Sequence, residues 1–245
     1  MILKVTAANG ASEFYTLDNN AARKEGIEAA IQVDSKVSDA WMGHPYFNII
    51  DNGGIGFDQK IDRLLQCVLN RMGLVDVRRQ AQHRKFKFLL SSSAPSIDFP
   101  VKFRDFHVEH RFLKNDSDQL MQVKIRKRGW DGSFTYTSST TVQVQNQVLE
   151  TRRNITQREY ESLLLHVDDD CVPVIKNRRN FIFNNRYYQI DSFVSPCSGM
   201  QLLEAHLSSS DEIPPFLSVL KQVTQDPAYS LYEISKRKEE KEEQE

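Results

Sequence analysis

Charged residues recur two apart inside segments that otherwise read as β-strands. Lys124 and Arg126 form one such pair, and Lys176 and Arg178 form another. Because successive side chains of a strand point to opposite faces, residues two apart share a face. Strands that repeatedly place cations on one face, with carboxylates on the same face of other strands, build a mixed-charge surface. If that surface lines a closed barrel, it forms an anion site with places for a metal.

The size and charge of the chain limit the classes of protein to which it can belong. The 245 residues are enough for one large or two ordinary domains, and the formal net charge of -1 gives no bulk attraction to polyanions. Cys67, Cys171 and Cys197 lack metal-type spacing and are odd in number, which favours reduced thiols. Residues 1–14 are too polar for a signal peptide, and no apolar run approaches membrane-spanning length. We therefore expect a cytoplasmic, intracellular protein.

The front of the chain follows a strand–helix–strand–helix order, which is typical of α/β units. The apolar patterns place these elements at residues 1–8, 19–41, 46–50 and 58–72. No GxxxxGK[ST] sequence occurs, so no phosphate-cradling loop is predicted. Asp51 and Asn52 follow the second strand and form either an acidic strand-end site or, more simply, an Asx turn. Residues 75–82 resemble a connector.

The rear of the chain is rich in strands. We predict them at residues 85–90, 104–113, 122–128, 132–137, 140–153, 172–176, 180–183, 186–194 and 201–207. Thr156 followed by Glu159 predicts a capped helix over 156–165, and a proline-led start predicts another over 214–223. Asn184-Asn185 is a hairpin turn candidate. The charged run 236–245 predicts a disordered tail.

The lysine and arginine side chains of the strands are the candidate groups for binding an anion. Taken singly, each cluster resembles a solvent-facing sheet surface, but the same spacing recurs on several strands. Guanidinium groups match two phosphate oxygens at once, and converging cations need carboxylates or a bound anion to relieve their repulsion. Matching strand positions hold the carboxylates Glu109, Glu150, Asp191 and Glu204. The acidic share of these strands argues against nucleic acid.

Residues 85–235 resemble the CYTH superfamily, which has the triphosphate tunnel fold. The family motif ExExK is similar to residues 107–111, RxR to 124–126, KxR to 176–178, ExD to 189–191 and the last ExE to 204–206. Metal-ligand carboxylates are replaced by His107, Gln189 and His206. The middle ExE motif reads Glu150-Thr151-Arg152, and Thr137 stands where the family has a lysine. The basic motifs of the tunnel are better retained than the acidic ones, which favours ligand binding over metal-dependent hydrolysis.

The chain also resembles the TRPL translocation defect protein family, which joins an AAA-type P-loop NTPase domain to a CYTH-like domain. Residues 13–17, 19–23 and 43–52 are similar to the end of the first domain. Residues 125–129, 152–156, 188–191 and 214–216 are similar to the second. The family is described as binding GTP and phosphoinositides and as serving membrane-protein trafficking. The resemblance implies that this chain begins after the P-loop portion.

These readings predict an α+β protein. We expect a partial P-loop-NTPase-like α/β segment without a Walker A motif over residues 1–80. A CYTH-like antiparallel β-tunnel, a closed barrel with flanking helices, would occupy 81–235, followed by the tail. Because a partial parallel sheet exposes edges, we expect the front to pack on the rear or to dimerise.

The predicted function is the binding of a phosphate-rich ligand in the basic tunnel: GTP, another nucleoside triphosphate or a phosphoinositide headgroup. The predicted phosphate-binding residues are Arg111, Lys124, Arg126, Arg128, Arg152, Lys176 and Arg178. The predicted weak Mg²⁺ or Mn²⁺ ligands are Glu109, Asp191 and Glu204. Peripheral membrane contact would follow from the family's trafficking role. The alternatives are a metal-dependent triphosphatase of the same fold and an interaction scaffold whose charges face water.

Overall fold

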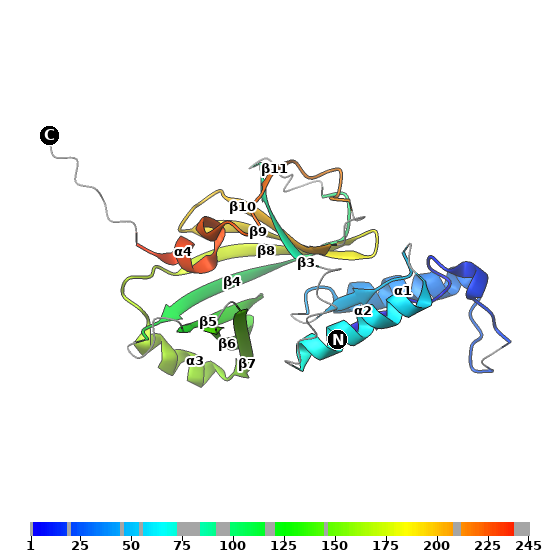
Figure 1. Ribbon diagram of the computed structural model, residues 1–245, viewed down its shortest axis with the longest axis horizontal. Coiled ribbons are helices and arrows are strands. Elements are labelled where there is room, and N and C mark those ends of the chain that lie inside the picture. The colour runs from blue at the N-terminus through cyan, green and yellow to red at the C-terminus, as the bar shows by residue number, and fades with distance from the viewer. Residues whose placement is uncertain are drawn as a thin grey trace.

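The computed structural model describes residues 2–18, 21–44, 47–53, 56–72, 84–91, 99–115, 121–144, 147–207 and 212–237 (Figure 1). The predicted connector at 75–82 and tail residues 238–245 lie outside the described residues. None of the described helices combines the length and the apolar character that crossing a membrane requires.

The front unit has the predicted element order. Strand β1 (Ile2–Lys4) pairs in parallel with β2 (Asn48–Ile50), and helices α1 (Ile27–Trp41) and α2 (Phe57–Arg71) follow the strands. A short 3₁₀ turn, η1 (Ser12–Phe14), lies before α1. Helix α1 begins later than predicted, because Arg23 donates to the carbonyl of Thr16 at 2.6 Å and Tyr15 donates to that of Glu25 at 2.7 Å. These contacts hold the preceding segment in a loop.

Asp51 and Asn52 have structural roles at the end of β2. The amide of Asn52 donates to the carbonyl oxygens of Thr6 and Asn9, both at 2.7 Å, and so joins the loops that follow β1 and β2. The Asp51 carboxylate lies 2.5 Å from Arg186 of the rear sheet. The strand-end carboxylate is therefore committed to holding the two parts of the chain together.

Within the described residues, the rear of the chain forms a nine-stranded antiparallel sheet in the order β11-β3-β10-β9-β8-β4-β5-β6-β7 (Figure 1). The bounds are β3 (Arg84–Leu90), β4 (Phe103–Leu113), β5 (Met121–Trp130), β6 (Ser133–Val144), β7 (Gln147–Ile155), β8 (Val174–Phe183), β9 (Arg186–Ser195), β10 (Gln201–Leu207) and β11 (Val219–Gln222). Asn184 and Asn185 adopt φ of 46° and 55° and make the predicted hairpin turn between β8 and β9.

The sheet is curved but its closure into a barrel is not found. Strand β11 lies at the top of Figure 1 and β7 near the bottom, with β8 and β4 between them, while β3 runs from beside β11 down to the level of β8. The edge strands β11 and β7 pair only with β3 and β6 among the described residues. The α+β class with an antiparallel sheet is confirmed, whereas the closed barrel is not.

Two other element predictions need correction. Residues 140–153 form parts of two strands, because β6 ends at Val144 and β7 runs back along it. Residues 214–223 hold β11 rather than a helix, because the open edge of β3 supplies backbone partners that the local sequence does not reveal. The capping box of Thr156 and Glu159 is present at α3 (Gln157–Leu163), which continues into η2 (Leu164–His166).

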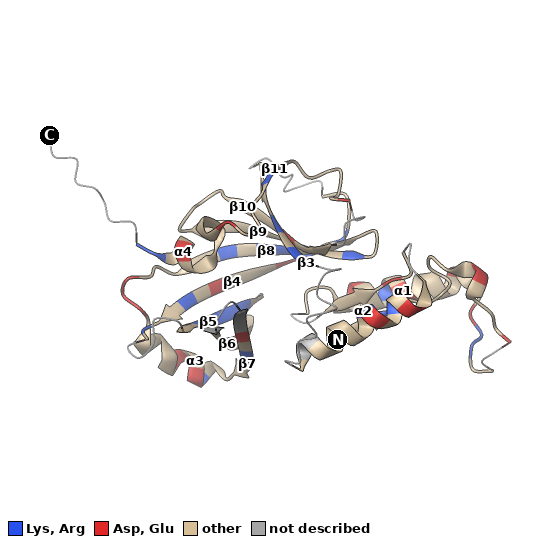
Figure 2. Cartoon of the chain, viewed as in Figure 1, with Lys and Arg blue, Asp and Glu red and all other residues tan. Residues whose placement is uncertain are grey.

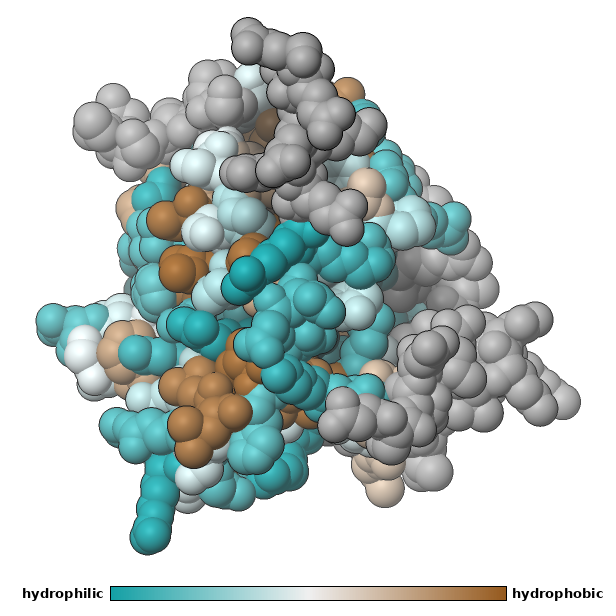
Figure 3. All heavy atoms as spheres, turned by 90° about the vertical axis from the view of Figure 1, so that its left-hand side faces the viewer, coloured by the Kyte–Doolittle hydropathy of each residue, from teal (hydrophilic) through white to brown (hydrophobic). Residues whose placement is uncertain are grey.

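Apolar side chains cover the outer face of the sheet. One cluster lies on the outer face of β3, β10, β9 and β8 and includes Leu217. Another lies on the outer face of β4, β5 and β7 and includes Tyr160 of α3. A third cluster lies on the opposite face, where Val174, Phe193 and Leu202 pack near α4 (Leu231–Ser235), which follows η3 (Pro227–Tyr229). Figure 3, which faces the side of the molecule with α3 and α4, shows hydrophobic patches within a mainly hydrophilic surface. The outer face therefore carries two of the three apolar clusters.

The front unit packs against one end of the sheet. Besides the Asp51–Arg186 pair, Lys102 lies 2.6 Å from Asp39, and Arg128 of β5 donates to the carbonyl of Gly43. Gly43 has a φ of +89°, and a Cβ added there would overlap the Phe106 ring of β4. This packing agrees with the expectation that a two-stranded front would need a neighbour.

We predict that Gly43→Ala weakens this packing. The left-handed backbone and the overlap with Phe106 should lower the free energy of unfolding by about 1–3 kcal/mol. Urea unfolding measures the loss, and limited proteolysis between residues 73 and 83 should become faster. Gly26→Ala is the control, because a Cβ there meets no atom within 4 Å. Equal stability of the two variants would contradict the prediction.

Candidate anion-binding face

One face of the sheet collects most of the predicted phosphate ligands. Directly paired residues of neighbouring strands share a face, so the register can be followed from β3 to β7. Lys176 of β8 is opposite Val108 of β4, which is opposite Arg128 of β5. The face so traced, here called the basic face, carries these charged residues: Lys85, Lys87, Arg104, Lys124, Arg126, Arg128, Glu150, Arg152, Lys176, Arg178, Asp191 and Glu204. Figure 2 shows the cationic bands on β4, β5 and β8.

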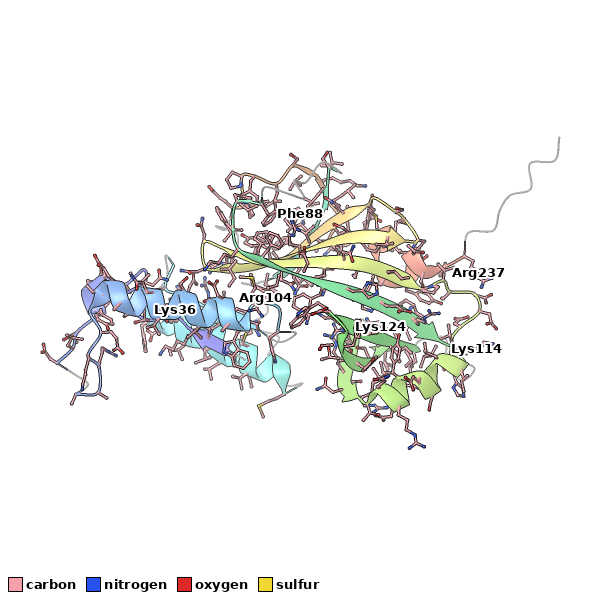
Figure 4. All side chains as sticks on the ribbon, turned by 180° about the vertical axis from the view of Figure 1, so that it is seen from behind. Lys36, Phe88, Arg104, Lys114, Lys124 and Arg237 are labelled. Carbon is pink, nitrogen blue, oxygen red and sulfur yellow. The ribbon has the colours of Figure 1, made fainter. Side chains whose placement is uncertain are left out.

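The centre of the basic face is buried although it is charged. Lys176 is 2% exposed, Arg128 5% and Arg126 8%. The front unit closes one end of this face through Gly43, and the Tyr232 ring of α4 lies 5.2 Å from that of Phe112 at the other end. Figure 4 labels Lys124 on β5, within the curved part of the sheet. The curvature and the two closed ends hold these side chains away from bulk water.

Asp191 is the centre of the charge network. Its Oδ2 accepts from Lys176 Nζ at 2.6 Å, while Arg178 donates through Nε and Nη2 at 2.6 and 2.7 Å, which is a bidentate contact. Burial raises the pKa of Asp191, but Arg178 and Lys176 outweigh it and hold the pKa well below its usual range. Burial, with repulsion from Arg178, lowers the pKa of Lys176 to about 8 despite the attraction of Asp191.

Glu204 and Glu150 balance the two sides of the basic face. Glu204 lies 2.9 Å from Lys85 and 3.8 Å from Lys87; burial raises its pKa, but Lys85 above all lowers it, to about 2. Glu150 lies 3.1 Å from Lys124 and 3.2 Å from Arg152. Burial raises the pKa of Glu150, and these two cations bring it below its ordinary value. Each of the three carboxylates on the face therefore already has a cationic partner.

Two predicted site residues lie on the other face. Glu109 is opposite Lys127, and Arg111 is opposite Ile125, so both point to the packed outer side of the sheet. They pair with each other at 2.7 Å. The expectation that they line the tunnel is therefore wrong, because β4 turns its even-numbered residues to the basic face.

Three residues of the basic face were missed by the sequence analysis. Lys85 and Lys87 are two apart on β3, the same signal that identified Lys124 and Arg126, but the family motifs begin at residue 107 and no site residue was predicted on β3. His110 of β4 stands directly opposite Arg126 and is 5% exposed. Nothing in the sequence singles it out, because it lies between Glu109 and Arg111, whose charges suggested the opposite orientation.

The predicted metal ligands do not come together. Glu109 is on the outer face, while Asp191 and Glu204 are held by lysine and arginine side chains. Among the described residues, no group of three or more His, Cys, Asp or Glu side chains is arranged to hold a metal ion. The donor set present on the basic face therefore does not fit Mg²⁺ or Mn²⁺, which prefer free oxygen ligands.

Comparisons with known proteins give weak structural similarities. No protein-family model matches the sequence, and no match was found among curated proteins. The inorganic triphosphatase NE1496 is similar over 62% of this chain and 93% of its own, at 18% identity and a TM-score of 0.45. The PH1819 protein of Pyrococcus horikoshii OT3 is similar over 54% and 82%, at 16% identity and a TM-score of 0.39. Function must be inferred from the side chains of the face itself.

We predict that Asp191→Ala strongly destabilises the protein. Removing a buried partner of two cations leaves uncompensated charge, which should lower the free energy of unfolding by about 3–5 kcal/mol. The control is Asp105→Ala, which breaks the Arg179–Asp105 pair at 2.8 Å on the outer face, where the Asp105 side chain is 49% exposed. That loss should be at most about 1 kcal/mol. Urea unfolding of both variants measures the difference, and similar losses would contradict a central role for Asp191.

Proposed function

We propose that the basic face binds the phosphate chain of a phosphate-rich ligand. The observation that carries this proposal is the excess of positive charge on one face of a curved sheet, which is buried at its centre, where Arg126, Arg128 and Lys176 lie. The described cations of the face are Lys85, Lys87, Arg104, Lys124, Arg126, Arg128, Arg152, Lys176 and Arg178, against the carboxylates Glu150, Asp191 and Glu204.

The charge balance of the face favours an anion. Buried like charges repel one another, and the carboxylates present are shared between cations: Asp191 serves both Lys176 and Arg178. Repulsion from Arg178, after burial itself, lowers the pKa of Arg128 to about 10. A bound anion would relieve this repulsion. Phosphate suits it, because guanidinium groups contact two of its oxygens at once.

The spread of the cations favours several linked phosphates. The cations come from β3, β8, β4, β5 and β7, and β8 is separated from β5 by β4. Strands are spaced at about 4.8 Å, so β8 and β5 lie about 10 Å apart along the sheet, which is wider than one phosphate group. A triphosphate or a multiply phosphorylated headgroup can therefore contact cations of more strands at once than a single phosphate can.

The identity of the ligand and the link to trafficking are proposed from the sequence resemblance. GTP, another nucleoside triphosphate and a phosphoinositide headgroup share the required chemistry, and the TRPL-like segments connect it with membrane-protein trafficking. Titration with tripolyphosphate, GTP and a soluble inositol polyphosphate, followed by binding to phosphoinositide-containing vesicles, would distinguish these ligands. The alternative is triphosphate hydrolysis with a divalent metal; NE1496 is named an inorganic triphosphatase. Binding is favoured here because the carboxylates of the face are paired with cations.

We predict that tripolyphosphate binds and that the Lys124→Ala/Arg126→Ala pair weakens binding at least about tenfold. Each charge-assisted contact is worth about 1.5–3 kcal/mol, so losing two of them should exceed one decade in affinity. Calorimetric titration at fixed ionic strength measures it. The control is Lys127→Ala, which removes a cation from the outer face of the same strand, where it lies 4.3 Å from the Phe134 ring centre.

The outcomes of this experiment separate the candidate functions. Equal affinity of the double variant and the wild-type protein would mean that the cations only face water. Release of phosphate from tripolyphosphate or GTP with Mg²⁺ or Mn²⁺, lost in the double variant, would establish the triphosphatase instead. Binding without turnover supports the proposal as stated.

We also predict that affinity for GTP falls as pH rises through about 8. The folded-state pKa of Lys176, about 8, lies below its ordinary 10.5, so the free protein loses this proton before the unfolded chain does. Between these values stability rises with pH, since the unfolded chain binds more protons. A bound anion favours the protonated amine of Lys176 and therefore raises its pKa. The affinity for GTP measured by titration should be lower at pH 9 than at pH 7, and this difference should be smaller in Lys176→Gln.

A further inference from the structure

A strip of three neighbouring residues crosses the basic face, and the polar atoms of two of them, His110 and Thr137, lack hydrogen-bond partners among the described residues. His110, Arg126 and Thr137 are direct neighbours on β4, β5 and β6. His110 is 5% exposed and Thr137 3%. Neither ring nitrogen of His110, nor the hydroxyl of Thr137, has a hydrogen-bond partner among the described residues. Buried polar groups without partners are rare and costly, so this strip calls for a bound group.

The surroundings of His110 show which kind of group fits. The charged neighbours that act on the ring are Arg126 and Lys124 from β5 and Lys176 and Arg178 from β8. The carboxylates of the same face, Glu150, Asp191 and Glu204, are bound to other cations. Burial first, and then these four cations, hold the pKa of His110 well below its usual range, so the ring is neutral in the free protein.

We propose that His110 contacts the ligand's phosphate oxygens and takes up a proton when they bind, so that filling the basic face is coupled to pH. This inference deepens the proposed function and rests on it. A phosphate over the strip supplies the missing acceptor for a ring N–H and for the Thr137 hydroxyl. Its negative charge also offsets the four cations that keep the ring neutral. The imidazolium then makes a charge-assisted contact that is stronger than the neutral one.

The proton balance of this step is simple. The free protein carries neutral imidazole, the solvent supplies one proton to a ring nitrogen, and no bond to the ligand is made or broken. Acidification from pH 8 to pH 6 therefore strengthens binding through His110. Loss of the proton from Lys176 acts in a different range, above pH 8. The two groups can thus be told apart by pH.

The test compares His110→Gln with wild-type protein, using tripolyphosphate as the probe. Calorimetric titration in two buffers of different ionisation enthalpy gives the number of protons taken up on binding. Tripolyphosphate itself exchanges protons, but this contribution is common to both proteins and cancels in the comparison. We expect the wild-type protein to take up more protons than His110→Gln at pH 6. The variant should lose about tenfold in affinity at pH 6 and less than about threefold at pH 8.

A matched control comes from the same strand. His107→Gln makes the same substitution three residues away on the outer face, opposite Asn177, and should leave proton uptake and affinity unchanged. Thermal unfolding of both variants checks the fold. If His110→Gln does not fold, the ring resonances of wild-type protein labelled at histidine nitrogens give the answer. The His110 ring should change from neutral to imidazolium on adding tripolyphosphate at pH 6.

The outcomes separate this inference from the proposed function. If wild-type protein and His110→Gln bind equally with the same proton uptake, the role of His110 is overturned while anion binding stands. If the ring stays neutral in the complex, the same conclusion follows. If wild-type protein binds no tripolyphosphate, GTP or inositol polyphosphate, both are overturned.

Discussion

The structure depends on the contact of Asp191 with Lys176 and Arg178. Two cations side by side on β8 could not be buried without a carboxylate that meets both, and the hydrogen-bonded register of β8 and β9 supplies it. Because a buried ion pair costs desolvation, this contact adds little to stability by itself. Its consequence is geometric: it fixes two cations on the basic face and leaves the other positive charges there short of carboxylates.

Most of the apolar packing lies on one face of the sheet and most of the buried charge on the other, where one apolar cluster lies under α4. Apolar residues of alternate positions form the clusters behind the sheet, so the fold is stabilised on the outer side. The inner side is then free to carry charge, and the front unit and α4 close its two ends. The unsatisfied atoms of His110 and Thr137 lie in the middle of this enclosed face. A protein that needed the face only for stability would satisfy them or replace them by apolar side chains.

Much of the fold could be predicted from local signals. The capping box at Thr156, the hairpin at Asn184-Asn185 and the alternation of most strands all depend on near neighbours in the chain. The strand β11 was mistaken for a helix, because its partner β3 is distant in sequence. The orientation of β4 was also wrong: charges at Glu109 and Arg111 and at His107 suggested one face, whereas pairing with β5 and β8 turns His110 inward.

The sequence by itself determined that cations two apart on a strand share a side, since this follows from the alternation of side chains in any strand. It therefore identified Lys124 with Arg126 and Lys176 with Arg178. Only the tertiary structure decided that these pairs share one face, that Lys85 and Lys87 join them, and that Glu109 and Arg111 do not. The physical reason is that register between strands is set by long-range pairing and packing, so a shift of one residue exchanges the two faces.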